Sequence, residues 1–255
     1  MFLLLFLFAN TELGCSKFSK MLARGGTEFK IQVETDKEDK KAVVRLAIKI
    51  VNSKMNAVGL PGDATEDPNN PNGFIVKLYG SQDLERSKTF LFTTHQLELR
   101  TLVSSPNPSP AQTFPTATAA QQAATGEQNI LPYTERDGAP ERFVIVDKTV
   151  IVSGEDIRDA QAVSRNKGDY QISFSLKPDA ATKFGDWTGK NINNYLAVVL
   201  DNKVQSMAYI KSQIFDSGEI SGRFSKEMAE DIALSLKSGY LPATMKVVEE
   251  KQLDK

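Results

Sequence analysis

The 255-residue sequence is poor in the residues on which catalysis, metal binding and cross-linking most often depend. Cys15 is the only cysteine, so neither an internal disulfide nor a zinc site with several cysteine ligands can form. His95 is the only histidine, which excludes a zinc site with several histidine ligands. Glycine-rich phosphate-binding motifs and the G-x-S-x-G nucleophile motif are absent as well. We therefore predict a protein that has no catalytic residue, metal or cofactor and is not an enzyme.

The chain also lacks an excess of charge of one sign. Lys and Arg together number 31 and Asp and Glu 32, which gives a net charge of −1. A nucleic-acid-binding protein normally carries a basic excess or a basic stripe, so we expect no nucleic-acid partner. The same balance gives no reason to expect binding to an anionic membrane surface.

No apolar run is long enough to cross a membrane. The segment 1–21 begins with the apolar run Met1–Phe8, which Asn10 and Glu12 then interrupt, whereas a spanning helix needs about 20 apolar residues. A signal peptide would have basic residues at its start, and a lipoprotein signal before Cys15 would have an apolar residue in place of Glu12. We favour the remnant of a membrane helix, with a signal peptide and a lipoprotein signal as the alternatives.

The pattern of residues 22–102 predicts a split βαβ, ferredoxin-like unit. Apolar residues alternate over 28–34, which is typical of a half-buried strand. A helix with one apolar stripe then follows and ends at Gly59. Residues 63–73 are polar and predict a loop. The remaining elements expected here are strands at 74–78 and 97–102 and a short helix at 82–92.

Residues 103–140 differ in composition from the rest of the chain. Ser104 to Pro140 contains six of the eleven prolines, many Ala, Thr and Gln, and few large apolar residues. Such a composition buries too little apolar surface to offset the entropy lost on ordering. We therefore predict a flexible linker or a disordered excursion.

Residues 141–238 again have the pattern of a folded α+β region. Tyr195–Leu200 is apolar throughout and predicts a buried strand, which Asp201 and Asn202 would join to the next strand by a tight turn. Ser225 is a helix N-cap residue, and Gly239 and Pro242 are typical of a helix end. Further elements are expected as a strand at 170–176, a second strand at 219–224, and helices at 155–163, 178–187 and 226–238.

Several large apolar side chains in this region are candidates for a binding surface. Most of the aromatic and aliphatic residues between Phe174 and Phe215 are expected in the core. Flexible or amphipathic side chains suit contact with many different polypeptides, and an apolar groove or a sheet edge can capture an extended chain by strand addition. The residues that we predict to bind polypeptide are Met207, Tyr209, Ile210 and Phe215.

Three motifs resemble those of the SecD family of protein-export subunits. Leu196 to Val204 is similar to the LAIVLDGxV stretch of that family. Ile220-Ser221-Gly222-Arg223-Phe224 resembles its I-S/T-G-N-F motif, and Ser225 to Ala243 resembles its F-T-x-E-E-A-x-x-L-A-x-x-L-R-S-G-A-L-P-A pattern. The sequence departs from the family at Ser206-Met207-Ala208, where the family has Ser-Ala-Pro.

The resemblance implies a domain outside the cytoplasm, made of a ferredoxin-like base and an inserted α+β head. Residues 22–102 would form the first part of the base, 103–140 the linker and 141–238 the head. Residues 239–255 would contain the return hinge, at Gly239 and Pro242, and the terminal base strand. The membrane helices that follow this domain in the family have no counterpart in the chain. In the family, those helices contain the ionisable residues thought to couple proton flow to movement.

The resemblance further implies binding of unfolded exported polypeptides at the extracytoplasmic side of the bacterial cell membrane, together with SecF and the SecYEG channel. Contact with the membrane would be made only through the missing helices or through partners. Two alternatives stay open. One is a non-enzymatic scaffold that docks to a membrane partner, and the other is a hydrolase that uses His95.

Overall fold

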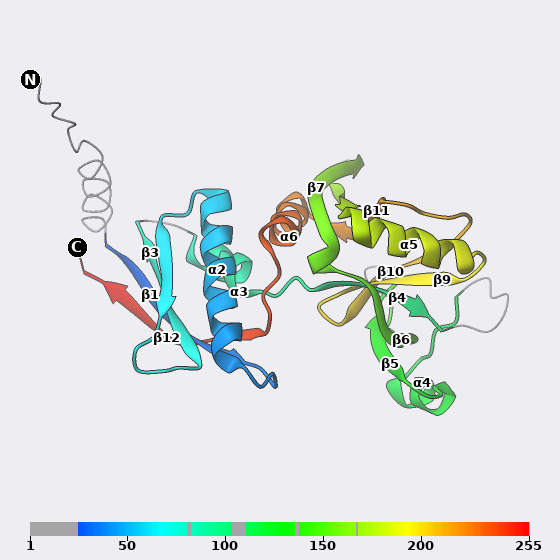
Figure 1. The fold of residues 1–255 in the computed structure, drawn as a ribbon, viewed down its shortest axis with the longest axis horizontal. Helices are drawn as coiled ribbons and strands as arrows, with labels where there is room; N and C mark the ends of the chain where they lie inside the picture. The colour runs from blue at the N-terminus through cyan, green and yellow to red at the C-terminus, as the bar shows by residue number, and fades with distance from the viewer. Residues whose placement is uncertain (1–24, 81–82, 104–110, 136–137, 167, 255) are drawn as a thin grey trace, which may run out of the picture. The chain divides into compact units, whose positions relative to one another are not determined.

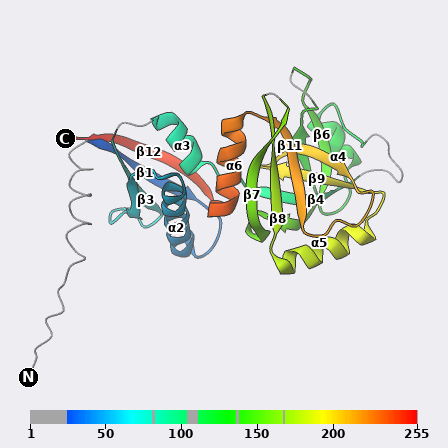
Figure 2. The same ribbon diagram turned by 90° about the horizontal axis from the view of Figure 1, so that it is seen from above.

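The computed structural model describes residues 25–80, 83–103, 111–135, 138–166 and 168–254, and these form two compact units. Unit 1 is the described part of Met1–Thr93 together with that of Leu241–Lys255, and unit 2 is the described part of Thr94–Tyr240 (Figures 1 and 2). Unit 2 is thus inserted between two segments of unit 1. The predicted hydrophobic segment 1–21 lies outside the described residues.

Unit 1 is a four-stranded sheet covered by two helices. Its elements are β1 (Gly26–Glu34), α2 (Lys40–Val58), β2 (Gly62–Glu66), β3 (Gly73–Tyr79), α3 (Leu84–Phe92) and β12 (Thr244–Leu253). The strand order is β12-β1-β3-β2, and all neighbours are antiparallel. Because β1 and β2 both run antiparallel to β3 between them, they are parallel to each other, as in a split βαβ unit. The predicted ferredoxin-like fold is confirmed.

The alternation in β1 produces the two faces of this sheet. Phe29, Ile31 and Val33 are buried, and the ring of Phe29 meets that of Phe92 from α3 edge-on, with 5.9 Å between centroids. The intervening Lys30 lies on the other face, where its Nζ is 2.7 Å from Glu249 Oε2 of β12. Apolar residues on one face and charged residues on the other are what a sheet with a single covered face requires.

Unit 2 combines a closed five-stranded barrel with a three-stranded sheet. The barrel has the order β10-β5-β6-β4-β9 and the sheet has the order β11-β8-β7. The barrel strands are β4 (Leu97–Leu102), β5 (Gln128–Tyr133), β6 (Arg142–Ser153), β9 (Tyr195–Leu200) and β10 (Lys203–Tyr209). The sheet strands are β7 (Ile157–Asn166), β8 (Asp169–Leu176) and β11 (Ser217–Phe224). The helices are α4 (Ala117–Ala123), α5 (Pro178–Lys190) and α6 (Lys226–Ser238), and Gly154–Asp156 forms a single 3-10 turn, η1.

Two apolar clusters hold unit 2 together. One fills the barrel, and all five barrel strands contribute to it. The other packs the outer face of the barrel against the three-stranded sheet and against α5 and α6. Strand β9 belongs to both, because Ala197 and Val199 point into the barrel while Leu196, Val198 and Leu200 point out of it. This explains why its sequence is apolar throughout.

The predicted linker at 103–140 is wrong for residues 111–135. This segment contains α4 and the barrel strand β5, and Leu131 and Ala120 are buried. Ladder pairing of β5 with β6, from Gln128↔Asp147 to Tyr133↔Arg142, supplies the order that the composition does not suggest. Pro132 is accommodated within β5, which has its full antiparallel partner on one side and, on the other, a single parallel pair to β10.

Three other expectations also need correction. Leu97–Leu102, predicted as a base strand, is β4 of the barrel, where it pairs with both β6 and β9. The helix predicted at 155–163 is absent: Asp156 accepts hydrogen bonds from the backbone and the hydroxyl of Ser153, which closes only η1, and β7 then pairs with β8. The predicted loop at 63–73 includes part of the short edge strand β2, whose one buried apolar side chain, Ala64, gives little pattern.

Candidate polypeptide-binding site

The two ends of the barrel interior are chemically different. At one end Arg100 Nη2 lies 2.6 Å from Glu98 Oε2, and Arg100 Nη1 also donates to the backbone carbonyl of Asp147 at 3.3 Å. Glu98 is paired with Val199 and Arg100 with Ala197 across the β4–β9 ladder, so both charged side chains share the inward face. This end is therefore filled by an ion pair. The opposite end is lined by Tyr133, Tyr195 and Met207, which are only partly buried.

A bulge in β10 determines which side chains reach the open end. The β9–β10 register shifts between Val204 and Ser206, and Gln205 is the extra residue. In a regular strand Ser206 would share the inward face of Val204, because side chains alternate with a period of two. After the bulge the inward residue is Met207, opposite Ala197, and the next is Tyr209, opposite Tyr195. Bulges commonly re-aim side chains at the rims of barrels, and this one does so here.

The open end, which we call the barrel mouth, contains a cavity of about 490 Å³. The residues that line it are Ala111, Thr113, Tyr133, Glu135, Arg142, Tyr195 and Met207. Arg142 is held in place by Thr113, since its Nε donates to Thr113 Oγ1 at 2.6 Å and its Nη2 to Thr113 O at 2.9 Å. The rings of Tyr195 and Tyr209 lie 5.2 Å apart, and Tyr209 Oη donates to Asn193 Oδ1 at 2.9 Å.

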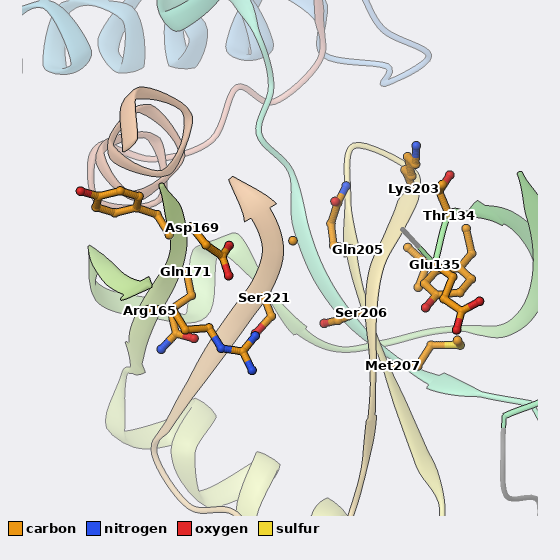
Figure 3. Close-up of a pocket in the computed structure, with 14 residues that line it drawn as sticks. Thr134, Glu135, Arg165, Asp169, Gln171, Lys203, Gln205, Ser206, Met207 and Ser221 are labelled. Carbon is orange, nitrogen blue, oxygen red and sulfur yellow. The ribbon is translucent and has the colours of Figure 1, made fainter. Parts of the chain in front are cut away.

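A groove of about 370 Å³ adjoins the mouth and runs between β10 and the three-stranded sheet. Tyr133, Glu135 and Met207 line both hollows, which makes the two continuous. Figure 3 shows the two sides of the groove, with side chains from Arg165, Asp169, Gln171 and Ser221 on one and from Thr134, Glu135, Lys203, Gln205, Ser206 and Met207 on the other. Its charged groups are two cations and two anions.

Backbone hydrogen-bonding groups also face this groove. Beyond its antiparallel ladder with β9, β10 pairs with β5 only at Val204↔Tyr133. On the other side β11 is the edge strand of its sheet, and its register with β8 shifts between Ser221 and Phe224. Within the described part of the chain, two strand edges thus meet the groove with unpaired stretches. Such edges are templates for an added strand.

The structure separates the four residues predicted to bind polypeptide. Met207 lines both hollows, and Tyr209 lies beside the mouth with 43% of its surface exposed. Phe215 is 64% exposed but lies over Gly185 of α5, away from both hollows. The prediction for Ile210 is wrong, because its side chain is fully buried in the cluster between barrel and sheet.

Two tyrosines complete the mouth and are not among the predicted binding residues. Tyr133 lies in the segment assigned to a linker, and Tyr195 was assigned to the core. The sequence pattern around Tyr133 could have indicated its position, because Ile130, Leu131 and Tyr133 form a short run typical of a strand inside a Pro-rich segment.

The hinge residues lie at the boundary between the two units. Gly239 ends α6 with φ 96° and ψ 143°, a conformation that residues with a side chain rarely adopt. Tyr240 is the last residue of unit 2 and Leu241 the first of the returning segment of unit 1, with Pro242 next. Their role in movement stays a prediction.

The environment of His95 offers no access to a substrate. Its Nδ1 lies 3.0 Å from Ser235 Oγ, and the exposed fractions of His95 and Ser235 are 8% and 0%. The described residues also contain no group of three or more His, Cys, Asp or Glu side chains that could hold a metal ion.

The sequence of the chain is similar to those of known proteins of one family. A protein-family model described as "SecDF, P1 head subdomain" matches residues 128–243 of the chain. This range includes β5 and the groove. Over 219 residues the chain is 33% identical to protein translocase subunit SecD of Aquifex aeolicus, which covers 86% of this chain and 40% of that protein. Over 218 residues it is 32% identical to SecD of Koribacter versatilis. This alignment covers 84% of this chain and 40% of that protein. The chain belongs to the SecD/SecDF family.

Solved SecDF structures share the fold of this P1 domain. The crystal structure of SecDF in a super-membrane-facing form aligns with a TM-score of 0.68 and 23% identity, over 91% of this chain and 31% of that one. A second structure, described as a membrane component SecDF that enhances protein export, aligns with a TM-score of 0.66 and 24% identity, over 87% of this chain and 98% of that one. The combination of base and head predicted from the resemblance is confirmed.

The family names agree with the expectation of a non-enzymatic component, since the relatives are named translocase subunits. The P1 domain spans about 40% of the length of the SecD relatives that it matches. Among the described residues, no helix is both long enough and apolar enough to span a membrane.

Proposed function

We propose that this P1 domain acts on the extracytoplasmic side of the bacterial membrane and binds exported polypeptide while it is still unfolded. The observation that supports the proposal best is the unpaired edge of β10 beside a continuous groove and mouth. An unfolded chain has free backbone N–H and C=O groups, which an exposed strand edge can bind without regard to sequence. Holding an emerging chain in this way would assist its release from the Sec channel.

The charge of the groove supports the same kind of ligand. Arg165 and Lys203 are balanced by Glu135 and Asp169, and none of these four makes an ion pair with another described residue. A polypeptide that carries charges of only one sign would be repelled either by the two cations or by the two anions of the groove. A polar segment of mixed charge is complementary to the groove.

Site-specific photo-crosslinking tests the proposal. A photoreactive amino acid at Gln205, on the edge of β10, should crosslink to a reduced and alkylated unfolded protein. The matched control is Met228, which is 54% exposed on α6 and does not line either hollow. Crosslinking from Gln205 alone supports the proposal. Equal yields at the two positions, or no crosslink at either, would contradict it.

We propose SecF and the SecYEG channel as partners, through which the domain would contact the membrane. Co-expression with SecF and SecYEG should then move the protein into the membrane fraction. The scaffold alternative is favoured by the face of the unit 1 sheet that the described helices leave uncovered, where charges alternate in sign across the strands at Asp63, Lys77, Glu28 and Lys251. A pure scaffold would show this fractionation without any client crosslink from Gln205.

A further inference from the structure

The barrel mouth has the features of a receptacle for one side chain. The Glu98–Arg100 ion pair and the buried apolar cluster occupy the barrel interior next to the mouth. Tyr133, Tyr195 and Met207 form its apolar wall and pack against that cluster. A volume of about 490 Å³ lies toward the lower end of the range for ligand pockets, about 300–1,000 Å³.

The position of the mouth relative to β10 determines how a bound chain would present its side chains. A chain added along the unpaired edge of β10 would alternate its side chains between two faces. One of these faces is the face of Met207, which lines the mouth, and the other is the face of Ser206, which lines only the groove. A residue whose side chain enters the mouth would therefore have neighbours whose side chains do not.

We infer that the mouth binds one bulky apolar side chain, best an aromatic one, of an extended polypeptide whose flanking residues lie in the polar groove. This inference rests on the proposed function and adds selectivity to it. Aromatic and thioether groups at Tyr133, Tyr195 and Met207 offer favourable contacts to an aromatic ring. The balanced charges of the groove suit polar neighbours on either side of that ring.

The test uses two fluorescently labelled peptides of Ser, Thr, Gln and Gly that differ at one central residue, Phe or Ala. Fluorescence anisotropy measures the Kd of each for the full chain. We expect the Phe peptide to bind about tenfold more tightly, which corresponds to about 1.4 kcal/mol. Equal Kd values for the two peptides would overturn the inference and leave the proposed function standing. If neither peptide nor an unfolded protein binds, the proposed function itself fails, and the inference fails with it.

Two variants locate the selectivity. Met207→Gln keeps the length of the side chain but makes the wall polar, and it should bring the ratio of the two Kd values close to one by weakening the Phe peptide. Phe215→Ser removes an exposed aromatic ring outside both hollows and should leave the ratio unchanged. A ratio that changes in Phe215→Ser but not in Met207→Gln would place the selectivity elsewhere and overturn the inference.

A third variant keeps the test decisive should Met207→Gln fail to fold. Met207→Ala enlarges the mouth and keeps it apolar, so a peptide with Trp at the centre should gain at least about threefold in affinity relative to the Phe peptide. The fluorescence of Trp187, the only tryptophan and a neighbour of the core between barrel and sheet, reports whether unit 2 is folded. An unchanged Trp-to-Phe ratio in a folded Met207→Ala protein would contradict the role of the mouth.

Discussion

The ring of Phe224 lies directly over Gly222, so that a β-carbon built on Gly222 would stand 2.3 Å from Phe224 Cζ. Phe224 and Ile220 are buried, and the shift in register between β11 and β8 occurs at this point. Gly222→Ala would therefore push a core ring out of its place. We expect a loss of about 1–3 kcal/mol in the free energy of unfolding of unit 2, as for other overpacked cores. Urea unfolding followed by the fluorescence of Trp187 measures it.

Gly185→Ala is the matched control and should have the opposite sign. A β-carbon at Gly185 would meet its nearest neighbours, Gln213 Nε2 and the ring of Phe215, at 3.6 Å, which is ordinary van der Waals contact. Gly185 lies inside α5, where alanine is favoured over glycine by about 0.5–1 kcal/mol. Loss of stability in Gly185→Ala equal to that in Gly222→Ala would show that the Phe224 ring is not the cause.

Patterns confined to one element predicted the structure well. The alternation of Phe29, Ile31 and Val33 placed β1 and its buried face, and the stripe that ends at Gly59 placed α2. Asp201 and Asn202 form the predicted tight turn between β9 and β10, with φ of 49° and 61°. These signals depend only on neighbours in the chain, and the spacing of side chains in strands and helices makes them readable.

Features that depend on distant partners were not predictable. β5 is ordered by its ladder with β6, which a Pro-rich sequence does not indicate. The assignment of β4 to the barrel follows from its pairing with β9, almost a hundred residues further along the chain. The bulge at Gln205 is the most consequential case, because it moves Met207 to the inward face, and no residue type in β10 marks it. The mouth therefore emerged only from the structure.

Lys54 stabilises the end of α3 from within unit 1. It is fully buried on α2, and its Nζ donates to the carbonyls of Phe90 and Thr93 at 3.0 and 3.1 Å. Lys54→Met would remove the donor from both carbonyls, and each buried polar group left without a partner costs about 1–3 kcal/mol. We expect a clearly lower midpoint of thermal unfolding by circular dichroism. Lys49→Met, on an exposed position of the same helix, should change stability by no more than about 0.5 kcal/mol.

The turn between β9 and β10 should tolerate glycine but not a branched side chain. Asn202 has φ 61°, a left-handed conformation that asparagine and glycine adopt readily and that costs most other residues about 1–2 kcal/mol. Asn202→Val should therefore lower the urea midpoint of unit 2, as followed by Trp187 fluorescence, while Asn202→Gly should keep it close to that of the native protein. Equal loss in both variants would mean that the asparagine side chain, and not the backbone, stabilises the turn.

The hydroxyl of Tyr240 should lose its proton at a higher pH than that of a free tyrosine, and this should make the stability of unit 2 sensitive to alkaline pH. Burial of the ring, reinforced by the carboxylate of Glu155, whose Oε1 accepts a hydrogen bond from Tyr240 Oη at 3.1 Å, raises the pKa of Tyr240 to about 12. A folded-state pKa above that of the unfolded chain, about 10, means that this contribution to stability is complete below pH 10. It is lost as the pH rises toward 12.

The tyrosinate absorbance of the native protein minus that of Tyr240→Phe isolates this one group. The difference should describe a single titration with a midpoint near pH 12. Glu155→Gln should move the midpoint down only part of the way toward 10, because burial is the larger cause and is unchanged by this substitution. Tyr79, whose pKa is also raised to about 12 but by burial and Asp63, is the internal control and should not move in Glu155→Gln. A return of Tyr240 to about 10 in Glu155→Gln would show that the carboxylate, and not burial, dominates.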